Sequence, residues 1–230
     1  MEIKTFKFLE GAAKAEGLTV IIDVFRAYTT AAYLFANQAE NIFIVSKVET
    51  ARKLKEKLET PVLIGERKGI KIEAFDFNNS PYFISQHNFE GKEIILSTSA
   101  GTKGIIAAEN AAEIITGSFV NIAAAAEYIK SQKSELVSLV AMGNNGVTEA
   151  AEDNLYAQEL EKILNGNRAL TEAEIKKKLR SPAGDRFFKE ETQSEMPKED
   201  FEYSLKINKF DFVIKADKKD DDVYQLKKKR

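Results

Sequence analysis

The sequence predicts an α/β fold with three layers, in which helices flank a mostly parallel or mixed sheet and a smaller C-terminal part contributes late strands. Two observations support this class. Short apolar runs rich in β-branched residues, which are typical of buried strands, alternate with segments of helical spacing. This alternation implies βαβ units, which place strands side by side in parallel. The chain has 230 residues and is 43% hydrophobic, which suits one domain with a substantial core.

The first part of the chain shows the alternation most clearly. The apolar run Thr19–Val24 predicts a buried strand, and Ala27–Ala36 predicts a helix after it. Ile42–Val45 predicts a second strand. Val48–Leu58 has apolar residues on one helical face, and Pro61–Ile64 predicts a third strand.

Residues 65–81 interrupt this rhythm with glycines, asparagines and charges, and they predict a long loop of the kind that is often functional. The alternation then resumes. Further strands are predicted at Glu93–Ser97, Glu113–Thr116 and Leu136–Met142, and further helices at Gly101–Asn110, Ile122–Ile129 and Glu149–Leu164.

The C-terminal third differs in character. Asn165–Asn167 indicates either a single loop or the start of a subdomain, from about residue 166, within one domain of residues 1–230. Thr171–Leu179 predicts a helix that begins with a capping box. Tyr203–Ile207 and Phe210–Ile214 predict two late strands. The basic end Lys227–Arg230 follows an acidic run and predicts an exposed, frayed tail.

Composition excludes several kinds of chemistry. There is no cysteine, which rules out disulfides, zinc-thiolate sites and thiol catalysis. The formal net charge of -2 argues against a nucleic-acid binder. No apolar stretch is long enough for a membrane span, and we expect a cytoplasmic protein. The one histidine, His87, lies in a polar stretch and predicts a surface residue, so acid–base chemistry would rely on carboxylates, lysines or a metal-bound water.

Polar residues collect where the predicted strands end, which is where ligands bind in parallel α/β sheets. Asp23 and Arg26 follow the first strand, and residues 65–69, 97–102 and 143–146 follow three others. Arginine binds phosphate oxygens in a bidentate way, and a loop that opens a helix offers N–H groups to an anion. Carboxylates beside a phosphate indicate magnesium. Helix caps, a surface ion pair or a turn would explain each feature equally well if taken alone.

Four segments resemble, in order, the sequence blocks of one known family. Ile21–Thr30 resembles the block IDVLRATTT, Gly65–Gly69 resembles GERGG, Phe75–Pro81 resembles FDLGNSP, and Ser97–Thr102 is similar to TTNGT. The family that the chain resembles is the 2-phosphosulfolactate phosphatases, over about residues 18 to 160. The resemblance implies an α/β fold and magnesium-dependent hydrolysis of 2-phosphosulfolactate, a step on a route to coenzyme M. Tyr28, Asn78 and Ser99 depart from the family pattern and leave the exact substrate open.

Together, the resemblance and the strand-end argument assign roles to a set of residues. The carboxylates expected to contribute to a magnesium site are Asp23, Glu66 and Asp76. The catalytic residues are expected to be Asp23, Arg26, Glu66 and Arg67. The residues expected to bind the substrate are Asn79, Ser80, Ser97, Thr98, Ser99, Gly101 and Thr102. A covalent aspartyl-phosphate at Asp23 is a second hypothesis. Against it, the segment Asp23–Phe25 lacks the second aspartate of the common aspartyl-phosphate motif.

Other functions remain open at this level. The substrate is expected to be a small anionic phosphorylated molecule, but a chain that binds such a metabolite without turnover would carry the same residues. A purely structural protein is disfavoured by the concentration of glycines, acids and arginines at strand ends. Apolar patches on the later helices would suit a homodimer.

Overall fold

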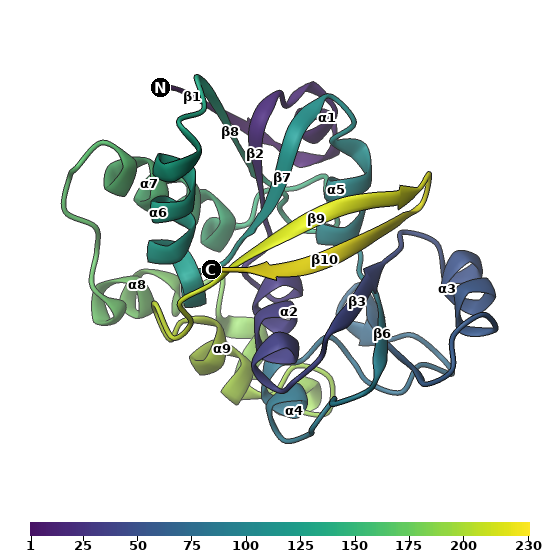
Figure 1. The fold of residues 1–230 in the computed structure, drawn as a ribbon. Coiled ribbons are helices and arrows are strands. Elements are labelled where there is room, and N and C mark those ends of the chain that lie inside the picture. Colours follow the sequence, from purple (N-terminus) through teal and green to yellow (C-terminus); the bar gives the residue numbers. More distant parts are fainter.

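The computed structural model describes all residues, 1–230, and confirms the α/β class (Figure 1). One sheet contains ten strands in the order β1-β8-β2-β7-β9-β10-β3-β6-β4-β5. The strands are β1 Glu2–Lys7, β2 Gly17–Ile22, β3 Asn41–Ile44, β4 Pro61–Arg67, β5 Ile70–Lys71, β6 Glu93–Ser97, β7 Ala111–Gly117, β8 Leu136–Ala141, β9 Val213–Asp220 and β10 Val223–Lys229. The helices are α1 Phe8–Lys14, α2 Ala27–Ala36, α3 Val48–Lys55, α4 Pro81–Ser85, α5 Gly101–Ala107, α6 Ile122–Gln132, α7 Ala151–Leu164, α8 Glu172–Leu179 and α9 Lys198–Ser204, with short 3-10 turns at Phe119–Asn121, Asp185–Phe187 and Glu190–Thr192.

The sheet consists of two parallel groups joined by an antiparallel hairpin. Strands β1, β8, β2 and β7 are parallel to one another, and so are β3, β6 and β4. The hairpin β9–β10, yellow in Figure 1, lies between the groups and pairs antiparallel with β7 on one side and β3 on the other. Since three successive pairings are antiparallel, the two parallel groups run in opposite directions. Both groups nevertheless supply their carboxyl ends to one cavity, described below.

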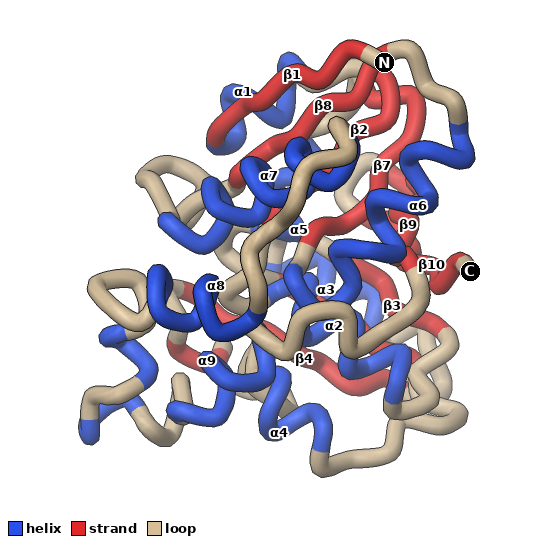
Figure 2. Tube along the Cα trace, turned by 90° about the vertical axis from the view of Figure 1, so that its left-hand side faces the viewer, coloured by secondary structure: helices blue, strands red, loops and turns tan.

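Helices cover both faces of the first strand group. Along β2, Val20 and Ile22 pack into an apolar cluster with residues of α6, α7 and α8, whereas Ile21 packs into a second cluster with residues of α1, α2 and α5. This alternation follows from the two-residue period of a strand. Figure 2 is viewed from the side of α6 and α7 and shows both helices in front of the strands. A smaller third cluster lies beneath α3 and contains Ala51, Leu63 and Ile95.

Residues after Asn165 pack into the same apolar clusters as the earlier elements. Leu179 of α8 and Phe201 of α9 are buried with strand residues of β2 and β8. The predicted capping box at the start of α8 is confirmed, since the side chain of Thr171 accepts from Glu174 N and the side chain of Glu174 accepts from Thr171 N.

Several predictions at the two ends of the chain are wrong. Tyr203–Ile207 is not a strand, because α9 extends to Ser204 and a turn follows. The second late strand begins at Val213 rather than Phe210. The basic end is not frayed, because Lys227–Lys229 form the last part of β10, in which buried Tyr224 and Leu226 alternate with less buried neighbours. Strand β1 and helix α1, at the other end, were not predicted, because the side chains of β1 are mostly exposed and show no apolar run.

Candidate active site

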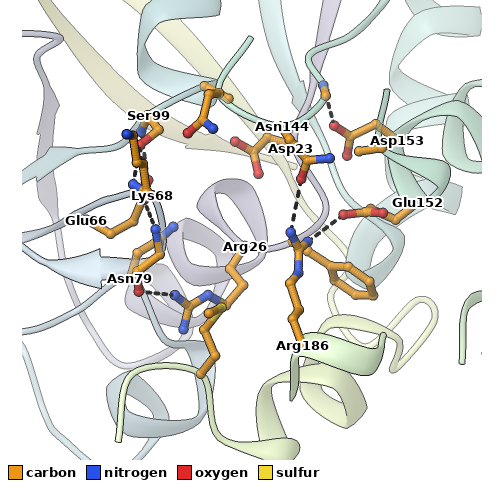
Figure 3. Close-up of a pocket in the computed structure, with 17 residues that line it drawn as sticks. Asp23, Arg26, Glu66, Lys68, Asn79, Ser99, Asn144, Glu152, Asp153 and Arg186 are labelled. Atoms are coloured by element: carbon orange, nitrogen blue, oxygen red, sulfur yellow. Dashed lines mark hydrogen bonds and ion pairs between the residues drawn. The ribbon is translucent and has the colours of Figure 1, made fainter. Parts of the chain in front are cut away.

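The carboxyl ends of four strands surround a polar cavity of about 240 Å³ (Figure 3). Residues that follow β2 and β8 lie on one side, and residues at the ends of β4 and β6 lie on the other. The start of α7 and the segment between α8 and α9 complete the wall. The lining residues are Asp23, Phe25, Arg26, Glu66, Lys68, Gly69, Asn79, Ser99, Ala100, Gly143, Asn144, Asn145, Ala150, Glu152, Asp153, Arg186 and Met196.

The carboxylate of Asp23 joins the starts of two helices. Its Oδ1 accepts a hydrogen bond from Ala27 N at 3.2 Å, and its Oδ2 accepts one from Gly101 N at 2.9 Å. A Cβ atom at position 101 would lie 2.9 Å from this Oδ2, so a glycine is needed for the close approach. Burial is the main cause that raises the pKa of Asp23 to about 6. The nearby charges of Glu66 and Glu152 also raise it, whereas the hydrogen bonds from the two N–H groups lower it.

Asp153, in the first turn of α7, makes an arrangement similar to that of Asp23. Its Oδ1 accepts from Val24 N and its Oδ2 accepts from Gly143 N, both at 2.9 Å. The carboxylate therefore ties the residue after Asp23 to the end of β8. Burial raises the pKa of Asp153 well above its usual range, and the charges of Asp23 and Glu152 raise it further.

Glu66 holds the turn that follows β4 against the loop that follows β6. Its Oε1 accepts from Ser99 N at 2.7 Å, and its Oε2 accepts from Gly69 N at 2.6 Å and from Ser99 Oγ at 3.1 Å. Ser99 Oγ in turn accepts from Lys68 N at 3.1 Å. Both oxygens of Glu66 are thus used to fix backbone, and the carboxylate faces the cavity from the side opposite Asp153 (Figure 3).

Arg26 enters the cavity from a fully buried ion pair. Its Nη1 donates to Asp200 Oδ2 at 2.6 Å and to the carbonyl oxygen of Glu195 at 2.8 Å. The side chains of Arg26 and Asp200 are 3% and 0% exposed. Asp200 Oδ1 also accepts from Ser80 Oγ and Tyr82 N, so one carboxylate of α9 positions both Arg26 and the start of α4.

Arg186 lies across the cavity from Arg26. Its Nη2 donates to Glu152 Oε1 at 2.7 Å and its Nη1 donates to Asn144 Oδ1 at 3.0 Å. Burial raises the pKa of Glu152, and the charge of Arg186 partly opposes this effect. The guanidinium therefore compensates one of the four carboxylates that line the cavity.

The distribution of charge fits a cation bound between Asp23 and Asp153. Arg26 is paired with Asp200, which does not line the cavity, and Arg186 is paired with Glu152. No ion pair neutralises Asp23 or Asp153, and each of their oxygens accepts only one backbone hydrogen bond. A carboxylate oxygen can accept a second partner, and hard divalent cations prefer such oxygens.

The cavity does not contain a complete set of protein ligands. Nowhere in the chain do three or more His, Asp or Glu side chains converge on one point as metal ligands. A cation here would consequently keep several water molecules, as magnesium does in sites with one or two carboxylates.

Five of the residues predicted from the sequence line the cavity. Asp23, Arg26, Glu66, Asn79 and Ser99 come together there from four separate segments. Asn79 is 3% exposed, and its Oδ1 has no hydrogen-bond partner. A buried amide oxygen without a partner is costly, which makes this group a candidate contact for a ligand.

Asp76 and Arg67 do not reach the cavity, although both were predicted to belong to the site. Asp76 is exposed and its Oδ2 accepts from Leu63 N at 2.8 Å, because its segment runs beside the middle of β4 instead of its end. Arg67 donates to three backbone carbonyls and to Ser97 Oγ, and it thereby joins the ends of neighbouring strands.

The segment Ser97–Thr102 was predicted to bind an anion through its N–H groups, and several of these groups have acceptors within the protein. Carboxylates of Glu66 and Asp23 accept from the N–H groups of Ser99 and Gly101. Thr98 and Thr102 satisfy each other. The predicted substrate-binding residues that do not line the cavity are Ser80, Ser97, Thr98, Gly101 and Thr102.

Other lining residues were not assigned a role from the sequence. Glu152 and Asp153, in the first turn of α7, were given no function from the sequence. Lys68 lay within the segment that follows β4 but was given no function. Arg186, and Asp200 behind Arg26, come from a polar region without any strand-end pattern, so no local signal could have identified them.

Comparisons with known proteins agree on one family. The sequence model of the 2-phosphosulpholactate phosphatase family matches residues 5–219 of this chain. A Bacillus subtilis protein named "Probable 2-phosphosulfolactate phosphatase" is 30% identical over 202 residues, which are 86% of each chain. A protein of the same name from Thermoplasma volcanium is 33% identical over 196 residues, which are 85% of this chain and 87% of the relative. Another from Carboxydothermus hydrogenoformans is 40% identical over 138 residues, which are 60% of this chain and 57% of the relative. The chain therefore belongs to the 2-phosphosulpholactate phosphatase family of phosphoric monoester hydrolases.

Proposed function

We propose that this protein catalyses the magnesium-dependent hydrolysis of 2-phosphosulfolactate, or of a closely related small phosphorylated hydroxy acid, to the alcohol and inorganic phosphate. The observation that carries the proposal is the charge pattern of the cavity. The carboxylates of Asp23 and Asp153 line the cavity without a paired cation, whereas Arg26 lines the same cavity and is held in place by Asp200. A polyanionic substrate would be repelled by these carboxylates unless a metal ion lay between them.

Asp23 and Asp153 are the best candidates for holding the metal, with Glu66 close enough to contribute through water. Both carboxylates are buried, and burial together with the neighbouring carboxylates raises the pKa of each. Bound magnesium would supply a Lewis acid for the phosphate oxygens and a water of lowered pKa. Asp153 replaces Asp76 in the set proposed from the sequence.

Arg26 is the proposed contact for the phosphoryl oxygens. Its Nη1 is fixed by Asp200 and Glu195, and its Nη2 makes a long hydrogen bond of 3.5 Å to the carbonyl oxygen of Gly69. The Nε–H and the second N–H of Nη2 are left for a ligand. Because an arginine already held in place loses little freedom on binding, it stabilises the charge of the transferred group efficiently. The amide of Asn79, whose Oδ1 is unpartnered, would position a substrate hydroxyl or an ordered water.

The contacts of Asp23 favour attack by water over a covalent aspartyl-phosphate. Both of its oxygens accept backbone N–H groups, which lowers their nucleophilicity and fixes them at the helix starts. In the direct reaction a water oxygen bonds to phosphorus, the ester P–O bond breaks, and a proton passes to the leaving alkoxide.

The test is release of phosphate from 2-phosphosulfolactate by the purified protein with magnesium, with a chelator, and with magnesium restored. We expect turnover only when the metal is present, and loss of turnover in Asp23→Asn and Asp153→Asn. Tight binding of the substrate without release of phosphate would instead identify a binding protein. Unchanged turnover in both variants would refute the assignment of the site.

A further inference from the structure

Lys68 differs from the other two cations that line the cavity. Arg26 is paired with Asp200 and Arg186 with Glu152, both at hydrogen-bond distance. The ammonium group of Lys68 takes part in none of the ion pairs or side-chain hydrogen bonds of the structure. The backbone N–H of Lys68, in contrast, donates to Ser99 Oγ. Lys68 is therefore the cation at this cavity whose charge is not yet committed to a protein group.

The backbone at Lys68 is unusual for a lysine. Its φ of 55° lies in the left-handed region, which glycine adopts far more readily. The conformation is maintained on both sides, because Ser99 Oγ accepts from Lys68 N and Glu66 Oε2 accepts from Gly69 N. These two hydrogen bonds fix the Cα of Lys68 at the edge of the cavity in spite of its unusual conformation.

The position is also fixed with respect to the C-terminal segment. A Cβ atom at Gly69 would lie 3.1 Å from the terminal methyl group of Met196, so this methionine packs directly over the turn. Lys68 itself is exposed at this edge of the cavity. Its ammonium group can therefore reach a ligand that occupies the cavity while its Cα stays in place.

We propose that Lys68 is a specificity-determining residue that binds an acid group of the substrate that is not transferred, a carboxylate or a sulfonate. The inference rests on the function proposed above. A small phosphorylated hydroxy acid carries more negative charge than its phosphate alone, and Arg26 with the carboxylate-bound metal accounts only for the phosphoryl group. The remaining acid group needs a cation, and Lys68 is the one available at this site.

The experiment compares two phosphate monoesters of secondary alcohols. Besides its phosphate, 2-phosphosulfolactate carries a carboxylate and a sulfonate, whereas isopropyl phosphate carries no acid group other than its phosphate. In Lys68→Gly, which suits the left-handed backbone, and in Lys68→Met, which keeps the bulk, we expect kcat/KM for 2-phosphosulfolactate to fall roughly 5- to 10-fold, as for a partly exposed ion pair. For isopropyl phosphate, kcat/KM should stay within about 2-fold of the wild-type value, and Lys68→Arg should restore most of the selectivity.

Product inhibition gives a second readout. Sulfolactate should inhibit both uncharged variants less strongly than the wild type, whereas inhibition by inorganic phosphate should not change. The matched control is Lys133→Gly, since Lys133 also has a left-handed backbone, with φ of 51°, and is exposed at the end of α6 away from the cavity. This variant should behave as the wild type toward both substrates.

The outcomes separate the inference from the proposed function. If the wild type hydrolyses neither ester, the proposed function fails and the role of Lys68 fails with it. If the wild type is active but Lys68→Gly and Lys68→Met retain full selectivity, only the inference is overturned. An equal loss toward both esters would also overturn it, because Lys68 would then contact the phosphoryl group.

Discussion

The Arg26 guanidinium donates to the Asp200 carboxylate at 2.6 Å, and this pair joins the end of β2 to a helix 174 residues further along the chain. Both side chains are buried. Asp200 also accepts from Ser80 Oγ at 2.6 Å, so the same carboxylate fixes the start of α4. The C-terminal segment therefore determines where the proposed phosphate-binding arginine points.

Asp200→Asn should weaken both folding and catalysis. Breaking a buried ion pair from one side leaves an uncompensated charge, and we expect the free energy of unfolding to fall by about 3 kcal/mol. Unfolding in urea measures this change. Loss of the fixed orientation of Arg26 should lower kcat/KM for 2-phosphosulfolactate by at least about 10-fold at saturating magnesium.

The control for this variant is Glu10→Gln, which removes the partner of Lys14 in an exposed pair. It should alter neither stability nor activity measurably, because solvent screens such pairs. If Asp200→Asn is as stable and as active as Glu10→Gln, Asp200 does not position Arg26.

Asp153→Asn should abolish the response to magnesium. The amide cannot replace the carboxylate as a ligand for a hard cation, so turnover should fall at least about 100-fold. Thermal unfolding provides a measure that does not depend on activity, since magnesium should raise the Tm of the wild type but not that of the variant. The matched control is Asp76→Asn, whose carboxylate is exposed outside the cavity. A normal magnesium-dependent rise of Tm in Asp153→Asn would contradict the proposed ligand.

The stability of the metal-free protein should fall as pH rises from about 4 to above 6. The pKa of Asp23 is about 6 in the folded protein and near its ordinary value of 3.8 when unfolded. In this window the folded state binds a proton that the unfolded state has lost, so the stabilisation present at low pH disappears. The linkage amounts to about 3 kcal/mol at most for this group.

Magnesium should reverse this pH dependence, since the metal competes with the proton for the carboxylates. We expect the increase in Tm on adding magnesium to be larger at pH 7.5 than at pH 5. Asp23→Asn provides the comparison, because it should lose the part of the decline that Asp23 contributes, while Asp153 and Glu152 still titrate. An equal effect of magnesium at both pH values would argue against binding at the titrating carboxylates.

Replacement by alanine should lower the stability of the fold at Asn78 but the catalytic activity at Asn79. The amide of Asn78 donates to the carbonyl oxygens of Gly69 and Glu195 and to the side chain of Glu195, so Asn78→Ala should destabilise the fold by about 1 to 2 kcal/mol. The Oδ1 of Asn79 has no partner in the protein. Asn79→Ala should therefore leave stability nearly unchanged while kcat/KM falls about 10-fold or more. Denaturant unfolding together with steady-state kinetics distinguishes the two, and a large loss of stability in Asn79→Ala would assign it a structural role instead.

The sequence alone determined the elements that depend on local periodicity. The apolar run of β2, the alternation of strands and helices from β2 to α7 apart from β5 and α4, and the capping box of α8 follow from neighbouring residues. These elements were predicted close to their observed positions. The strand-end rule likewise identified Asp23, Arg26 and Glu66. Asp76 was assigned to the site through the resemblance instead, and it lies outside the cavity because its segment runs along β4 and not beyond its end.

Tertiary structure decided which of these residues meet. The hairpin β9–β10 lies in the middle of the sheet, although its sequence is so rich in charge that its end resembled a solvated tail. Arg186 lines the cavity and Asp200 lies behind Arg26, and both come from a region with no periodic pattern. Such contacts join residues far apart in the chain, and they depend on burial and on the pairing of charges that no local pattern records. The sequence therefore indicates the chemistry of the strand ends, whereas packing determines which carboxylates are left without a cation.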